Sequence, residues 1–200
     1  MKALLIVDMQ KDFMPGGPLE TKGADALVPL INQLMGEFSL IVATKDWHPK
    51  DHLSFVSSHP GKKVGESILL GEVIQTLWPV HCVQESPGSE FARGLDAEKI
   101  DHICYKGVDK EVDSYSAFFD NGRLKKTGLE EYLRKKGVTE LVVVGVATDY
   151  CVLFTVLDAL ELGFSVTVLK EGCRGINLHP DDEKRAFVKM EENGARMVSR

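Results

Sequence analysis

Cysteine is scarce in this sequence, and no two cysteines stand close together. The 200 residues include four cysteines, which are too few for a disulfide framework and lack the close pairing of a thiolate zinc site. We therefore expect reduced thiols. Long apolar runs are also missing: the run that follows Lys2 ends at Asp8, too early for a signal-peptide core. No other run approaches the roughly twenty residues of a membrane span. The expected location is the cytoplasm.

Basic residues are outnumbered by acidic ones. The chain has 24 Lys and Arg against 30 Asp and Glu, which gives a formal net charge of -6. A surface that neutralises nucleic-acid phosphates or anionic lipid needs the opposite balance. With 44% hydrophobic and 27% charged residues, the composition is that of a folded globular chain. We predict a single domain over residues 1–200 that binds a small molecule, with no nucleic-acid or membrane partner.

Short apolar runs rich in β-branched residues alternate with helix-like stretches. The runs at 4–7, 40–43, 141–146 and 166–169 lack strict alternation, which is typical of strands covered on both faces of a parallel sheet. Helix-like stretches occupy 24–38, 129–136, 150–162 and 180–192, and weaker strand runs occupy 102–106 and 195–198. This order predicts an α/β fold, a three-layer α/β/α sandwich with a mostly parallel central sheet.

Two stretches, 44–95 and 107–126, break this alternation. The first is rich in Gly and Ser and contains Pro49, Pro60, Pro79 and Pro87. A segment of this length without regular structure of its own usually carries function. We therefore expect the region 44–95 to contribute to a functional site.

Three residues that could carry chemistry fall at the carboxyl ends of predicted parallel strands. Asp8 follows the first run, Lys106 ends the run at 102–106, and Cys151 lies where a helix begins after the run at 141–146. Open α/β sheets bind ligands at this edge. A helix N-terminus and a neighbouring ammonium both favour a cysteine thiolate, and a carboxylate can move the thiol proton. Each residue alone has an ordinary structural interpretation, but the shared edge favours a cysteine nucleophile.

A possible metal site lies in the region 44–95. Asp46 and His48 follow the second strand, His52 comes four residues later, and His81 precedes Cys82. One carboxylate with two or three imidazoles suits Zn, Fe or Mn, whereas Ca and Mg prefer oxygen ligands. The alternative is that these residues are surface histidines without a ligand.

These pieces together resemble the nicotinamidases, also called pyrazinamidases, of the isochorismatase-like cysteine hydrolase superfamily. The resemblance spans essentially the whole chain. Its motifs are Val7-Asp8-Met9-Gln10-Lys11-Asp12-Phe13, Lys45-Asp46-Trp47-His48-Pro49, Leu77-Trp78-Pro79-Val80-His81-Cys82, Tyr105-Lys106-Gly107 and Gly145-Val146-Ala147-Thr148-Asp149-Tyr150-Cys151-Val152.

The resemblance implies a catalytic triad of Asp8, Lys106 and Cys151. It also implies a cis peptide between Val146 and Ala147, with an oxyanion hole formed by the backbone amides of Ala147 and Cys151.

For the metal, the resemblance implies the ligands Asp46, His48 and His81, with zinc as the favoured ion and iron or manganese as alternatives. His52 matches a ligand in some members but not in others.

For the substrate, the resemblance implies nicotinamide, with pyrazinamide as a related amide. The ring nitrogen would bind the metal, and Phe13, Trp78 and Tyr115 would flank the ring. No organic cofactor is expected, and a homo-oligomer is compatible with the family.

Two other functions fit the same residues in part. A sister cysteine hydrolase could act on an N-carbamoyl compound, a ureide or another small amide with the same triad, but it would have no need of the metal set. A catalytically silent member could bind a small ligand or a partner protein, but it would have no chemical reason to keep Asp8, Lys106 and Cys151. A flavodoxin-like nucleotide binder is disfavoured because no glycine-rich phosphate loop follows a strand.

Overall fold

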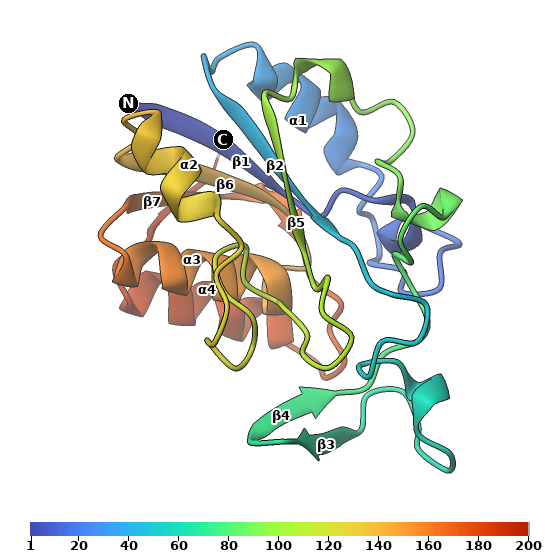
Figure 1. Ribbon diagram of the computed structural model, residues 1–200. Coiled ribbons are helices and arrows are strands. Elements are labelled where there is room, and N and C mark those ends of the chain that lie inside the picture. The colour runs from blue at the N-terminus through green and yellow to red at the C-terminus, as the bar shows by residue number, and fades with distance from the viewer. Residues whose placement is uncertain (200) are drawn as a thin grey trace.

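A six-stranded parallel sheet forms the centre of the computed structural model, which describes residues 1–199 (Figure 1). All neighbouring strands in it pair in parallel. In spatial order the strands are β5 (His102–Lys106), β2 (Ile41–Asp46), β1 (Lys2–Val7), β6 (Glu140–Val146), β7 (Ser165–Arg174) and β8 (Arg196–Val198). All six runs that the sequence indicated are strands, with ends shifted by a few residues.

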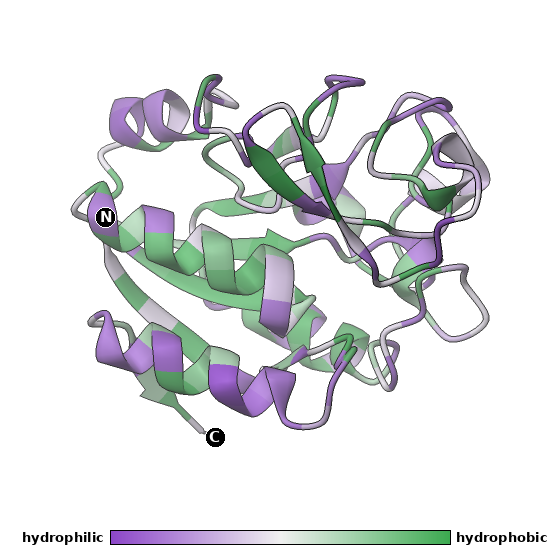
Figure 2. Ribbon diagram, turned by 90° about the horizontal axis from the view of Figure 1, so that it is seen from below, coloured by the Kyte–Doolittle hydropathy of each residue, from purple (hydrophilic) through white to green (hydrophobic). Residues whose placement is uncertain are grey.

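Helices cover both faces of this sheet, because alternate residues of each strand point to opposite sides. Leu4 and Ile6 of β1 pack in one apolar cluster with α1 (Leu27–Met35). Leu5 and Val7 pack in a second cluster with the helices of the other face, α2 (Leu129–Lys135), α3 (Leu153–Glu161) and α4 (Asp182–Glu192). Figure 2 shows these helices with apolar residues toward the sheet and polar residues outward. The predicted three-layer sandwich is confirmed.

The region 44–95 has more regular structure than the sequence predicted. It contains an antiparallel hairpin of β3 (Ser67–Leu70) and β4 (Val73–Thr76), which stands away from the sheet in Figure 1. The hairpin was missed because its polarity is inverted: Leu69 and Ile74 face solvent, whereas Gln75 is buried. The other elements here are the short 3-10 helices η2 (Val56–Ser58) and η3 (Pro87–Ser89).

Short irregular helices occur elsewhere in the chain as well. They are the 3-10 helices η1 (Lys11–Phe13) and η4 (Ala97–Lys99), and the π-helical turn η5 (Thr148–Val152) that leads into α3. The predicted helix at 150–162 is therefore a π-turn followed by an α-helix. The stretch 107–126 contains no helix or strand, as expected.

The strand order reverses between β1 and β6, and this point sets the place of the site. Chain connections leave β1 toward β2 and β5 on one side and lead to β6 and β7 on the other. Open α/β sheets bind ligands in the crevice at such a reversal. Gly145 of β6 approaches β1 so closely that an added Cβ would lie 2.1 Å from the backbone oxygen of Val7. A glycine is required there, since no larger residue fits between the two strands.

Among residues 1–199, the helices are too short or too polar for any of them to cross a bilayer.

Candidate active site

Asp8, Lys106 and Cys151 meet at the carboxyl edge of the sheet. The Lys106 ammonium lies 2.8 Å from Asp8 Oδ2 and 3.3 Å from Cys151 Sγ. Asp8 directly follows β1, Lys106 is the last residue of β5, and Cys151 lies in the π-turn after β6. All three side chains are buried. The parallel topology thus brings together three residues that are far apart in the chain.

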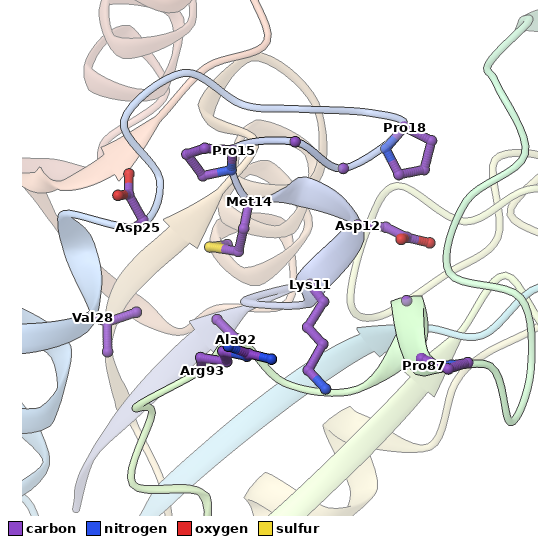
Figure 3. A pocket seen from close by; sticks show the side chains of 13 residues that line it. Lys11, Asp12, Met14, Pro15, Pro18, Asp25, Val28, Pro87, Ala92 and Arg93 are labelled. Carbon is purple, nitrogen blue, oxygen red and sulfur yellow. The ribbon is translucent and has the colours of Figure 1, made fainter.

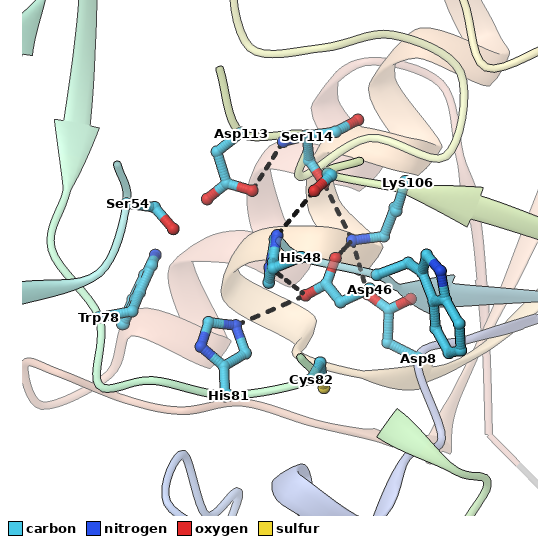
Figure 4. A network of polar contacts seen from close by, with 12 residues as sticks. Asp8, Asp46, His48, Ser54, Trp78, His81, Cys82, Lys106, Asp113 and Ser114 are labelled. Atoms are coloured by element: carbon cyan, nitrogen blue, oxygen red, sulfur yellow. Dashed lines mark hydrogen bonds and ion pairs between the residues drawn. The ribbon is translucent and has the colours of Figure 1, made fainter. Parts of the chain in front are cut away.

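The Lys106 ammonium has four partners in this buried centre. Besides Asp8 and Cys151, it forms an ion pair with Asp46 Oδ1 and donates a hydrogen bond to the backbone oxygen of Ser114 at 3.0 Å (Figure 4). Burial opposes the charged form, but the two carboxylates raise the pKa of Lys106 well above its usual value. Lys106 therefore remains a cation and offsets the charge of its neighbours.

Asp8 is fixed by Thr44 of the neighbouring strand. The Thr44 hydroxyl donates to Asp8 Oδ1 at 2.6 Å and accepts the Asp8 backbone N–H at 3.1 Å. Asp8 has φ 49°, a left-handed conformation that turns the chain at the strand end. Thr44 thereby leaves Oδ2 of Asp8 directed at Lys106 and the thiol.

The pKa shifts in this centre suit a proton transfer between Cys151 and Asp8. Burial raises the pKa of the Cys151 thiol well above its usual value, although Lys106 works against this shift. Burial also raises the pKa of Asp8, again opposed by Lys106. The resting cysteine is therefore a thiol, and Asp8 is a better proton acceptor than an exposed carboxylate.

The backbone before Cys151 has an unusual geometry. The peptide between Val146 and Ala147 is cis, as the resemblance implied. The backbone oxygen of Ala147 accepts the N–H groups of Tyr150 at 3.1 Å and Val152 at 3.0 Å. These bonds hold the turn that places Cys151 at the start of α3.

A second group of buried side chains lies next to Lys106. Asp46 Oδ2 is 3.6 Å from His48 Nε2 and 3.7 Å from His81 Nε2 (Figure 4). One ligand atom from each of the three residues lies within 4.8 Å of the others. Burial opposes ionisation of Asp46, but Lys106 and His48 hold its pKa well below the usual range. The carboxylate is therefore available as a ligand.

The two imidazoles are oriented by backbone oxygens behind them. His48 Nδ1 donates to the oxygen of Gly107 at 2.9 Å, and His81 Nδ1 donates to that of Pro79 at 2.8 Å. The bond at each Nδ1 leaves Nε2 as the atom of each ring that faces Asp46 Oδ2 and could bind a metal, the usual arrangement of histidines that bind metals. The Nε2 of His48 is buried and has no hydrogen-bond partner among residues 1–199. The donor set fits a divalent cation with open coordination positions.

His52 lies beside this group, but its Nδ1 is taken up by a hydrogen bond within its own loop. Its ring centroid is 4.4 Å from that of His48. The backbone N–H of Ser54 donates to His52 Nδ1 at 3.1 Å, and burial lowers the pKa of the imidazole. In the resulting neutral ring the proton is on Nε2, so this nitrogen has no free lone pair. Among residues 1–199, Nε2 of His52 is buried and finds no hydrogen-bond partner.

Aromatic side chains surround the two groups. Phe13 lies edge-on to His81 with ring centroids 5.6 Å apart, and Trp78 lies edge-on to Tyr150 at 4.8 Å. The Tyr115 ring is 5.4 Å from that of Tyr150, and its hydroxyl accepts the indole N–H of Trp78 at 3.2 Å. Trp78, Tyr115 and Tyr150 thus form one aromatic group, and Phe13 lies against His81.

Some supporting residues were not found from the sequence. Gln10 is fully buried, donates to the backbone oxygen of Asp46 at 2.8 Å and accepts the Asp46 N–H at 2.8 Å. Thr44 has the role described above. Both lie inside or beside recognisable motifs, but neither residue type signals such a contact from sequence alone.

A surface pocket of about 510 Å³ lies next to the segment 11–18 (Figure 3). Its lining includes Lys11, Met14 and Arg93, and none of the catalytic or metal-group candidates. Asp12 also lines it, and the Asp12 carboxylate accepts the backbone N–H of Cys82 at 2.7 Å. The pocket therefore borders Asp12, which holds the backbone next to His81. It is not lined by Asp8, Lys106 or Cys151.

The fold and the site define a family. A profile of the isochorismatase domain matches residues 2–200, and the chain belongs to that family. The chain is 46% identical over 202 residues to the nicotinamidase of Escherichia coli K12, covering 99% of this chain and 94% of that protein.

Solved structures agree with this assignment. A nicotinamidase/pyrazinamidase of Acinetobacter baumanii is 41% identical, with a TM-score of 0.96 and coverage of 99% and 95% of the two chains. The yeast nicotinamidase bound to the inhibitor nicotinaldehyde is 33% identical, with a TM-score of 0.93 and full coverage of both chains. The pyrazinamidase of Pyrococcus horikoshii in complex with zinc is 38% identical, with a TM-score of 0.80 and coverage of 100% and 99%.

Proposed function

We propose that this chain is an amidohydrolase that converts nicotinamide, and the related pyrazinamide, to the carboxylic acid and ammonia. The observation that carries the proposal is the position of the Lys106 ammonium, 2.8 Å from Asp8 and 3.3 Å from the Cys151 sulfur, in a buried centre. Similar proteins named nicotinamidase or pyrazinamidase support the choice of substrate.

The first half of the reaction forms a thioester. Asp8 accepts the thiol proton while the Cys151 sulfur attacks the amide carbon, and the carbonyl electrons move onto the oxygen. The backbone amides of Ala147 and Cys151 form the proposed oxyanion hole for that charge. When the carbon–nitrogen bond breaks, Asp8 returns the proton to the departing nitrogen, and ammonia leaves.

The second half hydrolyses the thioester. Water attacks the acyl carbon as Asp8 takes one of its protons, and the carbon–sulfur bond breaks. The proton returns to sulfur, which restores the thiol and releases the acid. Lys106 stays charged throughout and keeps Asp8 and Cys151 at the distances that both steps need.

Asp46, His48 and His81 are the proposed ligands of one divalent metal ion. The zinc complex of the similar Pyrococcus protein favours zinc, with iron and manganese as alternatives. When bound, the ion would supply a coordination position for the ring nitrogen of the substrate. Phe13, Trp78 and Tyr115 would contact the ring, because flat apolar walls suit a small aromatic ligand. No organic cofactor is required.

The experiment is ammonia release from nicotinamide by purified wild type, Cys151→Ala and the double variant Asp46→Ala/His48→Ala, with metal content measured on each. We expect activity in wild type only, and loss of metal in the double variant. Cys151→Ala keeps all three proposed ligands, so it serves as the control that should retain metal. Wild type that carries metal but leaves nicotinamide intact would overturn the substrate assignment.

Three wider properties are part of the same proposal. We infer that the chain acts as one domain, with region 44–95 completing the site, and that it acts in the cytoplasm. Among the described residues, Cys82, Cys104, Cys151 and Cys173 are all free thiols, which is compatible with a reducing compartment. A homo-oligomer is compatible with the proposal but not required by it, because every proposed site residue comes from one chain.

A further inference from the structure

Gln75 is a buried amide on an otherwise exposed hairpin. It lies on β4 with 1% of its surface exposed, whereas its neighbour Ile74 is 73% exposed. Strand alternation turns Gln75 toward the body of the protein. A buried primary amide costs free energy unless its donors and acceptor find partners. The partners of Gln75 therefore indicate its role.

Apart from the backbone oxygen of Thr76, those partners belong to the segment 113–121. Gln75 Nε2 lies 3.1 Å from Asp113 Oδ2 and 3.1 Å from the Tyr115 hydroxyl, in addition to 2.7 Å from the backbone oxygen of Thr76. Gln75 Oε1 is 3.4 Å from the side-chain amide of Asn121. Asn121 in turn accepts the backbone N–H of Tyr115 at 2.9 Å. One amide thus connects the hairpin to both ends of Tyr115.

The Tyr115 hydroxyl is held from two sides. Trp78 Nε1 donates to it at 3.2 Å, and Gln75 Nε2 donates at 3.1 Å. Both partner nitrogens carry only N–H groups, so the phenol oxygen is the acceptor in both contacts, and Gln75 shares its two N–H groups among Tyr115, Asp113 and Thr76. The ring of Tyr115 is then fixed at 6.5 Å from that of Trp78. These two rings are walls of the proposed substrate site.

We propose that Gln75 is a positioning residue that holds the Tyr115 phenol against Trp78 and so fixes the spacing of the two aromatic walls. The inference rests on the proposed function for its kinetic consequence, because Gln75 acts on the substrate only through Tyr115.

The same segment reaches Lys106 through contacts that do not involve Gln75. The backbone oxygen of Ser114 accepts from Lys106, and the Ser114 hydroxyl lies 2.7 Å from the backbone oxygen of Phe119 and 3.0 Å from that of Ser116. These bonds keep the Lys106 acceptor in place when Gln75 is changed. Loss of Gln75 should therefore weaken substrate binding and leave the chemical step nearly intact.

The first measurement is kinetic. We expect Gln75→Leu to raise KM for nicotinamide about fivefold, the effect of one lost hydrogen bond, with kcat within about twofold of wild type. Ile74→Thr, on the outer face of the same strand, is the matched control and should leave both constants unchanged. In the Tyr115→Phe background, Gln75→Leu should add little to the rise in KM, because both changes act on one contact.

The second measurement does not depend on the substrate. The chain has two tryptophans, so Trp47→Phe identifies the indole N–H resonance of Trp78 in an NMR spectrum. Gln75→Leu should move that resonance in the same direction as Tyr115→Phe, and Ile74→Thr should not move it. If Gln75→Leu does not fold, Gln75→Met keeps the length of the side chain, removes the donors and carries the same expectations.

The outcomes separate the two proposals. An unmoved Trp78 resonance together with an unchanged KM would overturn the role of Gln75. A shifted resonance in a protein that does not hydrolyse nicotinamide would support Gln75 and overturn the proposed function instead.

Discussion

An added Cβ at Gly107 would lie 2.4 Å from Cε1 of His48. Gly107 directly follows Lys106, has φ 63°, and offers its backbone oxygen to His48 Nδ1. The turn after β5 is thus in direct contact with the proposed metal group. The absence of a side chain at Gly107 allows the imidazole to take its place beside Asp46.

Gly107→Ala should therefore reduce metal binding. The new methyl group must displace the His48 ring, and a misplaced ligand typically weakens metal affinity about 10- to 100-fold. The measurement is metal bound per chain after dialysis against graded chelator concentrations. Gly61→Ala is the matched control: Gly61 has φ 83°, so the backbone strain is similar, but a Cβ there meets nothing within 4 Å. Equal metal content in the two variants would contradict the prediction.

Thr44→Val should move the acid limb of the pH profile to higher pH. Asp8 must be ionised to take the thiol proton, so activity falls as pH falls through its pKa. Burial raises that pKa above its usual 3.8, and the Thr44 hydrogen bond partly lowers it again. Removing the hydroxyl raises the pKa of Asp8 further, and protonated Asp8 then persists to higher pH.

The measurement for Thr44→Val is kcat/KM against pH, compared with wild type and with Thr167→Val. Thr167 lies on β7, where it pairs with Val142 and Arg196 and makes no contact with the site. Thr167→Val should leave the acid limb unmoved. An acid limb that stays in place or moves to lower pH in Thr44→Val would show that Asp8 is not the titrating base.

Lys106→Met should destabilise the fold as well as abolish activity. It leaves the carboxylates of Asp8 and Asp46 buried without their cation, and breaking such a buried pair typically costs about 3–5 kcal/mol. Adding Asp8→Asn to Lys106→Met should restore part of the stability but no activity, since one uncompensated charge is removed. Urea unfolding of the single and double variants measures this. Additive losses in the double variant would argue against a shared charge network.

Gln10→Ala should weaken metal binding, because the Gln10 side chain holds the backbone of Asp46. It removes both hydrogen bonds to the backbone of Asp46 and leaves a buried N–H and a buried oxygen unpaired, at about 1–3 kcal/mol for each group. We expect lower thermal stability and less bound metal. Gln84→Ala is the control, because the Gln84 side chain makes one recorded hydrogen bond, to the Trp47 backbone oxygen at 3.0 Å, and the substitution keeps the backbone bond from Gln84 to His48. If both variants lose metal to the same extent, Gln10 has no special role.

Much of the fold and the meeting of the main residues could be predicted from the sequence. The spacing of apolar residues along the chain indicates strands and helices directly. Parallel strands bring Asp8, Lys106 and Cys151 to one edge of the sheet, independently of the conformation of the loops. The cis peptide at Val146 was expected from resemblance, since no property of the residues Val and Ala favours it.

Other features depend on contacts that leave no local pattern. Thr44 and Gln10 matter because of what lies opposite them in space, and a threonine or glutamine in or near a strand looks the same without such a partner. The hairpin at Ser67–Thr76 was missed because Gln75 points inward and Leu69 and Ile74 point outward, the reverse of the usual rule for strands. The inversion is explained by the network that Gln75 joins.

Asp46 divides its two oxygens between two tasks. Oδ1 pairs with Lys106, and Oδ2 faces His48 and His81. A carboxylate is a rigid planar group, so a rotation about its Cβ–Cγ bond moves both oxygens together. Any cation bound by the histidines must therefore alter the field at Lys106, and the charge of Lys106 must alter the affinity for the cation by the same free energy. The proposed nucleophile and the proposed metal position would therefore behave as one thermodynamic unit, joined through the side chain of Asp46.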